Sequence, residues 1–332
     1  MQKPIWRAAI VGCGKIAGLK DRPREHGVVT THAQAYHRHP GFAMAAVVSQ
    51  PLADAWRFQE IWSVPQVYAS IGEMLAQEYL DVVSICTPNE FHFLQAQEIL
   101  LGPNRPKVLF IEKPVCLKAT ELHELLEISR QTGVAVLVNH TRRFDPAHLQ
   151  SAELIQSGQL GLLLMGRGVY YGGWMHNGVH FIDTLRMLMN AEPVIVSASP
   201  GKAPSGKPGD QNLDVHLALG QAPVAVESFD EAYYQLFEME LRFERGRLRF
   251  LDFGSRIYLE QVQINEIGER ELVPMSGSPL QGLDSPLSAA MQAIDAELRG
   301  HSRLKELGVD LASASGTMNL IWRARELAAA QA

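Results

Sequence analysis

Three sets of residues in this sequence have types and spacings that suit chemistry. The first is Gly12-x-Gly14-x-x-Ala17, the pattern of a dinucleotide-binding turn with alanine in its third small position. Gly12 would let the chain turn sharply out of a strand, Gly14 would let the backbone approach a pyrophosphate, and Ala17 would allow close packing. A helix N-terminus after the turn would direct N–H groups at the phosphates. Because glycines form many turns, the pattern gains weight from its place after an apolar strand.

The second set is Glu112-Lys113-Pro114, which follows an apolar run at residues 107–111. A lysine at the end of a buried strand can hydrogen-bond a substrate hydroxyl and help to move its proton. Burial lowers the pKa of such a lysine toward the useful range. A surface lysine in contact with solvent is the alternative interpretation of Lys113.

The third set is His176 and His180, four residues apart. An imidazole titrates near neutrality, so His180 suits removal of a proton from a hydroxyl whose carbon loses a hydride. A helix histidine bonded to backbone is the alternative interpretation. The spacing also occurs in metal sites, but the glutamate of H-E-x-x-H is missing, and we expect no metal here.

The elements that must position these residues alternate between apolar runs and helical stretches. Strands are expected at 8–11, 42–49, 67–68, 80–86, 107–111 and 134–138, with helices between them. This alternation predicts a doubly wound parallel sheet over the first 140 residues. Ligands bind such sheets beyond the carboxyl ends of the strands. The predicted cofactor contacts are therefore Gly12, Gly14, Lys15, Ile16, Ala17, Ser49, Gln50, Thr87, Pro88, Asn89, His92 and Glu112.

Ser49 and Gln50 stand where an NAD-binding unit carries Asp or Glu for the ribose hydroxyls. The missing carboxylate removes repulsion toward a 2′-phosphate, so the sequence favours NADP over NAD. No arginine follows at once, and Arg57 is the nearest.

The pattern changes after Pro146, where segments with period-two alternation follow one another between 162 and 264. They predict an antiparallel sheet, with helices at 148–157, 177–189, 286–299 and 311–330. The chain thus divides into domains 1–145 and 146–332, and the last helix could pack back on the first domain. An open-faced sheet with one apolar face needs a cover, so we expect a homodimer or homotetramer through this sheet.

The composition is that of a soluble globular enzyme, with 46% apolar and 20% charged residues in 332. A net charge of −6 without a basic tract argues against nucleic-acid binding. No long apolar window predicts a membrane span, and the N-terminus lacks a signal-peptide layout. Cys13, Cys86 and Cys116 have no disulfide or metal spacing, so a cytoplasmic location is expected.

Taken in order, the motifs of the whole chain resemble the Gfo/Idh/MocA oxidoreductases, relatives of glucose–fructose oxidoreductase and inositol dehydrogenase. The motifs are GxGxxA at 12–17, TPxxxH at 87–92, EKP at 112–114, NxxRF at 139–144 and GxHxxD at 178–183. The resemblance implies an N-terminal Rossmann domain that binds NAD(P), and a substrate domain with an open-faced, mostly antiparallel sheet and flanking helices. It also implies hydride transfer between nicotinamide and a carbinol or ketone of a sugar, polyol or sugar derivative.

The resemblance assigns proton handling to Lys113 and His180. One position departs from the family pattern, because His176 stands where an Asp usually precedes this histidine. His176 could bind an anionic group of the substrate or relay a proton. The predicted catalytic residues are Lys113, His180 and His176. The predicted substrate-binding residues are Lys113, His140, Arg143, Trp174, His176, Asn177 and His180.

Two other functions stay open at this point. One is a redox-neutral sugar enzyme, in which a tightly held NAD oxidises and then re-reduces the same sugar. The other is a cofactor-binding regulator without catalysis, which the departure at His176 favours. Retention of Lys113 and His180 argues against the regulator, because a sensor needs neither residue.

Overall fold

The computed structural model describes residues 5–301 and 304–331 of the chain. They divide into two compact units. The first is made by Met1–Phe144 with Ser285–Ser315, and the second by Asp145–Asp284 with Gly316–Ala332.

The first unit contains a six-stranded sheet in which every pairing is parallel. Its strands are β1 (Trp6–Val11), β2 (Phe42–Val48), β3 (Gln66–Tyr68), β4 (Val82–Ile85), β5 (Val108–Glu112) and β6 (Ala135–Asn139). Their order, β3-β2-β1-β4-β5-β6, is that of a dinucleotide-binding Rossmann sheet. The strand order reverses between β1 and β4, which places a ligand crevice at their carboxyl ends. The predicted doubly wound sheet is confirmed.

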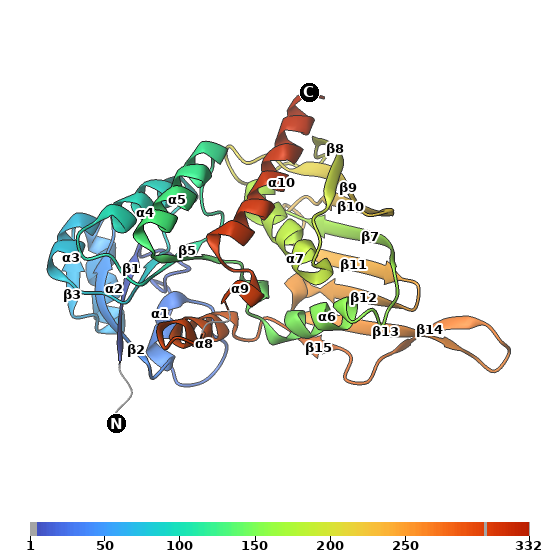
Figure 1. Ribbon diagram of the computed structural model, residues 1–332, viewed down its shortest axis with the longest axis horizontal. Coiled ribbons are helices and arrows are strands. Elements are labelled where there is room, and N and C mark those ends of the chain that lie inside the picture. The colour runs from blue at the N-terminus through green and yellow to red at the C-terminus, as the bar shows by residue number, and fades with distance from the viewer. Residues whose placement is uncertain (1–4, 302–303, 332) are drawn as a thin grey trace. The chain divides into compact units, whose positions relative to one another are not determined.

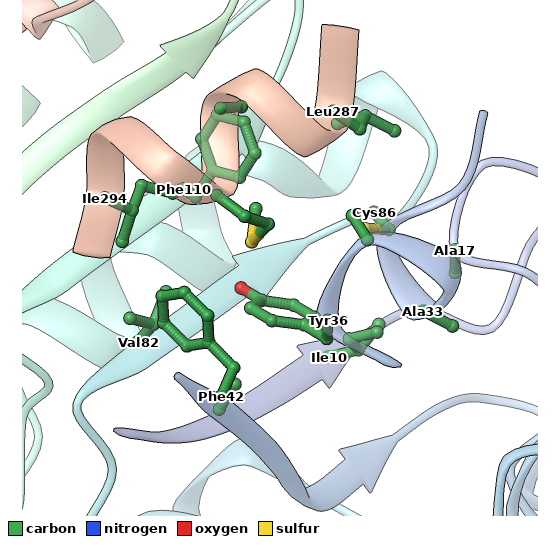
Figure 2. Packing of buried hydrophobic residues seen from close by; sticks show 14 of the residues in the cluster. Ile10, Ala17, Ala33, Tyr36, Phe42, Val82, Cys86, Phe110, Leu287 and Ile294 are labelled. Carbon is green, nitrogen blue, oxygen red and sulfur yellow. The ribbon is translucent and has the colours of Figure 1, made fainter. Parts of the chain in front are cut away.

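Helices cover both faces of this sheet. They are α1 (His32–Arg38), α2 (Leu52–Trp62), α3 (Ile71–Gln77), α4 (His92–Leu101), α5 (Ala119–Thr132), α8 (Pro286–Leu298) and the short α9 (Leu304–Leu307). Side chains of α1, α2 and α8 share one buried cluster with the sheet. Figure 2 shows Leu287 and Ile294 of α8 in this cluster with Tyr36 of α1 and Phe110 of β5.

The helix expected directly after the glycine pattern does not form, which corrects the sequence prediction. Residues 14–20 make a single turn, in which the N–H groups of Gly18 and Leu19 both donate to Gly14 O at 3.2 Å. Gly18 then takes φ +127°, a conformation that stops a helix, and its carbonyl accepts from Trp62 Nε1 at 3.0 Å. The first helix, α1, begins only at His32.

The stretch 285–315, expected in the second domain, lies in the first unit. Trp6 Nε1 donates to Asp295 Oδ1 of α8 at 2.8 Å. Val138 N at the edge of the sheet donates to Val309 O, also at 2.8 Å. Apolar side chains of α8 complete the sheet's buried cluster. The sequence of an amphipathic helix shows which of its faces is apolar, but not which sheet that face covers. The predicted domains, each a continuous range (1–145 and 146–332), therefore did not assign residues 285–315 to the first unit.

The second unit contains a nine-stranded sheet in the order β14-β13-β12-β11-β7-β10-β9-β8, with β15 paired to β13 (Figure 1). Its strands are β7 (Leu163–Tyr170), β8 (Val194–Pro200), β9 (Leu213–Leu219), β10 (Ala222–Ser228), β11 (Glu238–Phe243), β12 (Gly246–Leu251), β13 (Arg256–Ile264), β14 (Arg270–Pro274) and β15 (Leu280–Gln281). All pairings are antiparallel except β10 with β7. The mostly antiparallel sheet is confirmed, although β14, β15 and α9 were not predicted.

Helices α6 (Pro146–Gln156) and α7 (Val179–Met189) pack on one face of this sheet. A Cβ at Gly168 of β7 would lie 1.8 Å from the Phe181 ring of α7, so only glycine fits there. On α6, the ring centroid of His148 lies 5.5 Å from that of Phe250 on β12. The last helix, α10 (Leu311–Ala329), begins in the first unit and continues in the second.

The face of the nine-stranded sheet opposite α6 and α7 carries charged side chains. Arg167 pairs with Glu227 at 2.6 Å across β7 and β10, and Arg247 pairs with Glu260 at 2.6 Å across β12 and β13. Assembly through this sheet stays a prediction. No helix among residues 5–301 and 304–331 is long and apolar enough to cross a membrane.

Met291 provides a test of α8 as part of the first unit, because its side chain is fully buried there. We expect Met291→Ala to lower the free energy of unfolding by about 2–5 kcal/mol, through lost burial and a residual cavity. Gln292→Ala, on the exposed side of the same helix, should change it by no more than about 0.5 kcal/mol. Hydrogen exchange of the β1 and β4 amides, combined with urea unfolding, measures both. Equal free energies of unfolding of the two variants would contradict the packing of α8 against the sheet of the first unit.

Candidate functional site

A pocket of about 440 Å³ lies at the carboxyl ends of β1, β2 and β4. All of its lining residues belong to the first unit. They are Val11, Gly12, Cys13, Gly14, Val48, Ser49, Gln50, Asp54, Cys86, Thr87, Pro88, Phe91 and Gln95. This is the crevice at which doubly wound sheets bind their ligands.

Gly12 and Gly14 play different parts in this pocket. Gly12 has φ +93°, and a Cβ there would lie 2.5 Å from Thr87 Cγ2, so both conformation and space require glycine. At Gly14 the nearest atom to an added Cβ would be Cys86 O at 3.8 Å, and the residue is exposed. Gly14 therefore leaves open room against the backbone, as a pyrophosphate would need.

Hydrogen bonds hold two of the polar side chains of the pocket. Ser49 Oγ accepts from Cys13 N at 3.2 Å, and Thr87 Oγ1 donates to Gln95 Oε1 at 2.6 Å. Burial is the main cause that raises the pKa of the Cys13 thiol to about 12, so this cysteine is a neutral lining group. Asp54, in the first turn of α2, is the one charged residue in the lining set.

The pocket contains half of the predicted cofactor contacts. Gly12, Gly14, Ser49, Gln50, Thr87 and Pro88 line it, whereas Lys15, Ile16, Ala17, Asn89, His92 and Glu112 are not among its lining residues. Sequence reasoning missed the other seven lining residues, which are Val11, Cys13, Val48, Asp54, Cys86, Phe91 and Gln95. The spacing of Phe91 and Gln95, four residues apart after Thr87, was an available signal for one helix face.

His92 is not exposed to a ligand, which corrects its assignment as a cofactor contact. Its ring is fully buried. Nδ1 lies 2.7 Å from Pro114 O and Nε2 lies 2.8 Å from Thr87 O. The imidazole therefore ties the segment after β4 to the segment after β5.

Glu112, the last residue of β5, is the centre of a buried polar network. Its Oε1 accepts from His32 Nε2 at 2.8 Å and from Asn139 Nδ2 at 2.5 Å. Burial favours the neutral acid, but these hydrogen bonds and the nearby charges of His32 and Lys113 hold the pKa of Glu112 below its ordinary value. No sequence pattern points to His32, because it lies 80 residues from its partner Glu112 in the chain.

Lys113 lies between two residues that are fixed in place. Glu112 before it is anchored by His32, and the carbonyl of Pro114 after it faces the buried ring of His92. The lysine itself is only partly buried. The structure thus holds the backbone of Lys113 firmly at the carboxyl edge of the sheet.

The predicted residues of the second unit lie on a turn of π-helix, Trp174–Gly178, that runs directly into α7. His176 and His180 are partly buried there. The Asp210 carboxylate accepts from the N–H groups of Met175 and His176, both at 2.8 Å. Asp210 comes from a different loop, between β8 and β9, and the sequence did not single it out.

Trp174 is fully buried, which corrects its assignment to substrate binding. Its Nε1 donates to Ile321 O at 3.0 Å, and its ring centroid lies 5.6 Å from that of Tyr170. A ring in this position is part of the core and offers no face to a sugar.

His140 and Arg143 follow β6 and are also buried. Arg143 Nη1 donates to Leu307 O at 3.2 Å, so the guanidinium helps to hold the α9 segment. A contact of either residue with substrate stays a prediction. Among residues 5–301 and 304–331, no three His, Cys, Asp or Glu side chains are grouped as a metal site requires.

The comparisons with known proteins agree with this geometry. Residues 6–140 match the family model GFO_IDH_MocA, described as an oxidoreductase family with an NAD-binding Rossmann fold. The scyllo-inositol 2-dehydrogenase (NAD(+)) of Bacillus subtilis is 30% identical over 166 residues, 44% of this chain and 46% of that one. The 1,5-anhydro-D-fructose reductase of Ensifer adhaerens is 27% identical over 260 residues, 73% and 76% of the two chains.

The likeness to solved structures extends over the whole fold. The 3-ketoreductase KijD10 of Actinomadura kijaniata, solved with TDP-benzene and NADP, has a TM-score of 0.75 at 18% identity, covering 98% of both chains. At that identity the likeness establishes the fold alone. The chain spans about half the length of several curated relatives that it matches.

Gly14 and Gly12 provide a paired test of the pocket. We expect Gly14→Ala to leave the free energy of unfolding within about 1 kcal/mol of wild type and to weaken NADH binding at least tenfold. The reason is that the new methyl group lies in open space that the pyrophosphate would occupy. Gly12→Ala should instead destabilise the fold, because its Cβ meets Thr87. Nicotinamide fluorescence titration and thermal unfolding check both, and unchanged NADH affinity in Gly14→Ala would contradict the site.

Proposed function

We propose that this protein, whose first unit belongs to the Gfo/Idh/MocA oxidoreductase family, is an NAD(P)-dependent dehydrogenase or reductase acting on sugars, polyols or their derivatives. The reacting group would be a carbinol or its ketone. The observation that carries the proposal is the pocket at the β1–β4 reversal, whose open backbone at Gly14 suits a pyrophosphate. The names of the inositol dehydrogenase and anhydrofructose reductase relatives support the substrate class.

The residues of the first unit fit a dinucleotide. Gly14 would admit the pyrophosphate, Ser49 and Gln50 would face the adenosine ribose, and Thr87 and Pro88 would continue the wall toward Lys113. A bound nicotinamide cofactor supplies or accepts the hydride. The protein's own side chains must then handle the proton of the substrate hydroxyl.

Lys113 and His180 are the groups to which we assign this task. The Lys113 ammonium would donate a hydrogen bond to the substrate oxygen and stabilise negative charge that develops there. The His180 imidazole would take the hydroxyl proton during oxidation and return it during reduction. His176 would contact the substrate next to it, with Asn177. The Asp210 carboxylate fixes the turn that carries His176 through the two backbone N–H groups.

The preference between NAD and NADP depends on two opposing features. Ser49 and Gln50 lack the carboxylate that repels a 2′-phosphate, but Asp54 lies in the same pocket wall. No cation accompanies Asp54 among the described residues that line the pocket. A lone carboxylate there accepts ribose hydroxyls and disfavours a phosphate dianion. We therefore propose that Asp54 shifts the preference toward NAD, against the prediction from Ser49 and Gln50.

Lys113 separates an enzyme from a regulator. We expect Lys113→Met to lower kcat at least a hundredfold on any substrate found by screening, because the polarising ammonium is lost. NADH affinity should change less than threefold, as followed by nicotinamide fluorescence. Lys118→Met, an exposed lysine in the same segment, is the matched control and should retain wild-type turnover.

The outcomes of this experiment discriminate the three functions. Unchanged turnover in Lys113→Met would contradict the assignment of Lys113. Wild-type protein that binds NADH but turns over no carbinol and reports ligand binding by other means would favour the regulator. Conversion of a sugar without net change in nicotinamide absorbance would favour the redox-neutral enzyme.

Asp54→Asn tests the cofactor preference. Removal of the charge should raise the ratio of NADPH to NADH affinity about tenfold or more, because repulsion of the 2′-phosphate is relieved. Glu60→Gln, further along the same helix and outside the pocket lining, should leave that ratio unchanged. Titrations of wild type and both variants with the two reduced cofactors provide the comparison. An unchanged ratio of NADPH to NADH affinity in Asp54→Asn would contradict a role of Asp54 in cofactor preference.

A further inference from the structure

The turn after β12 has an unusual backbone. Asp252, Phe253 and Gly254 take φ values of +49°, +63° and +91° in succession. A residue with a Cβ loses roughly 1–2 kcal/mol in this left-handed region, and a bulky aromatic residue is rarely found there. Strained positions of this kind persist where surrounding contacts enforce them, and they cluster at binding sites.

Backbone hydrogen bonds within the turn and to two other segments hold its conformation. Phe253 N donates to Phe237 O at 3.2 Å, and Ser255 N donates to Asp252 O at 3.0 Å. Gly282 N donates to Ser255 O at 2.8 Å. Hydrogen bonds to Phe237 on one side and to Gly282 on the other thus hold the left-handed turn in place.

The turn presents the ring of Phe253 to Tyr171. Their centroids lie 5.8 Å apart with an interplanar angle of 86°, an edge-to-face pair. Phe253 remains 37% exposed, whereas Phe237 and Phe250 at the ends of the neighbouring strands are 5% and 3% exposed. The ring of Phe253 is therefore not a full member of the core.

The aromatic pair adjoins the turn that carries the predicted substrate residues. Tyr171 O accepts from Asn177 Nδ2 at 2.8 Å, and Asn177 follows His176 directly. Strand β11 is antiparallel to both β7 and β12, so β7 and β12 end at the same edge of the sheet. Both rings and the histidine turn thus belong to one edge of the second unit.

We propose that Tyr171 and Phe253 form an aromatic platform on which the ring of the substrate packs. The inference rests on the proposed function and narrows its substrate class to cyclic polyols and pyranose sugars rather than open-chain polyols. A cyclic sugar has an apolar C–H face and a polar rim. The partly exposed Phe253 ring, which contacts Tyr171, offers an apolar surface, and the Asn177 amide, bound to Tyr171 O, offers a polar group at the same edge of the sheet. Binding sites combine apolar walls with a few polar groups that fix orientation.

The test compares a cyclic and an open-chain ligand with similar hydroxyl groups. We would use myo-inositol and sorbitol as probes, and measure their binding to the NAD-loaded protein by saturation-transfer difference NMR. Wild type should bind myo-inositol at least fivefold more tightly than sorbitol. Phe253→Leu keeps apolar bulk but removes the flat face, and should lose that preference. Phe253→Tyr keeps the face and should retain it.

Phe229→Leu is the matched control. Phe229 packs against Tyr234 with centroids 4.7 Å apart, on the loop after β10. This variant should bind both probes as wild type does. Thermal unfolding of every variant shows whether the fold is kept, and Phe253→Leu should unfold within a few degrees of wild type.

Several results would overturn the inference. One is myo-inositol affinity in Phe253→Leu equal to that of wild type, and another is an equal loss of myo-inositol and sorbitol affinity in that variant. The others are a loss of myo-inositol affinity in Phe229→Leu as large as in Phe253→Leu, and no binding of myo-inositol by wild type. Uracil serves as a planar base that carries no sugar. Uracil binding that depends on Phe253, without myo-inositol binding, would assign the platform to a base and overturn the sugar-ring assignment. If the wild type turns over an open-chain polyol and Phe253→Leu does so at the same rate, the aromatic platform is contradicted, whereas the proposed oxidoreductase function is supported.

Discussion

The close approach of the β1 and β4 segments is the constraint on which the candidate cofactor site depends. β1 lies between β2 and β4, and its exit at Gly12 passes so near Thr87 that an added Cβ would lie 2.7 Å from Thr87 N. No side chain fits there, and φ +93° excludes one on conformational grounds as well. Because the two strand ends meet at this point, the chain must diverge beyond it. The divergence leaves Gly14 exposed to the pocket and places Thr87 in the pocket wall. The close contact of Gly12 with Thr87, which only glycine permits, thus creates the space for a ligand.

A second constraint is the buried carboxylate of Glu112. An ionised group in this position is tolerated only if it is hydrogen-bonded, and His32 and Asn139 both donate to it. The cost of burial thus requires that α1, β5 and β6 come together in one arrangement. His92 adds a link between the segments after β4 and β5. The result is a rigid frame around the backbone of Lys113, whose own side chain is left partly exposed.

The sequence predicted those parts of the fold that local patterns determine. The expected strand at 42–49 and helix at 311–330 agree with β2 and α10 to within one residue, because each has a regular apolar pattern and clear ends. It did not predict features that depend on distant partners. Gly18 stops the helix expected after Ala17, and Trp62 binds its carbonyl. The burial of Trp174 depends on Ile321, and the place of α8 depends on its bond to Trp6. Residue type alone therefore identified the polar strand ends of the site, but not which of their side chains face a ligand.

The turn that carries His176 shows how a tertiary contact changes the meaning of a sequence departure. The resemblance led us to expect a carboxylate at position 176, and its absence counted against a standard proton-handling site. Asp210 supplies a carboxylate to the same turn from another loop, bound by the N–H groups of Met175 and His176. The turn therefore has a carboxylate bound to its backbone N–H groups, although the sequence carries His176 in place of the motif's aspartate. Because the departure at His176 does not leave the turn without an acidic residue, it is weaker support for a regulator than the sequence alone suggests.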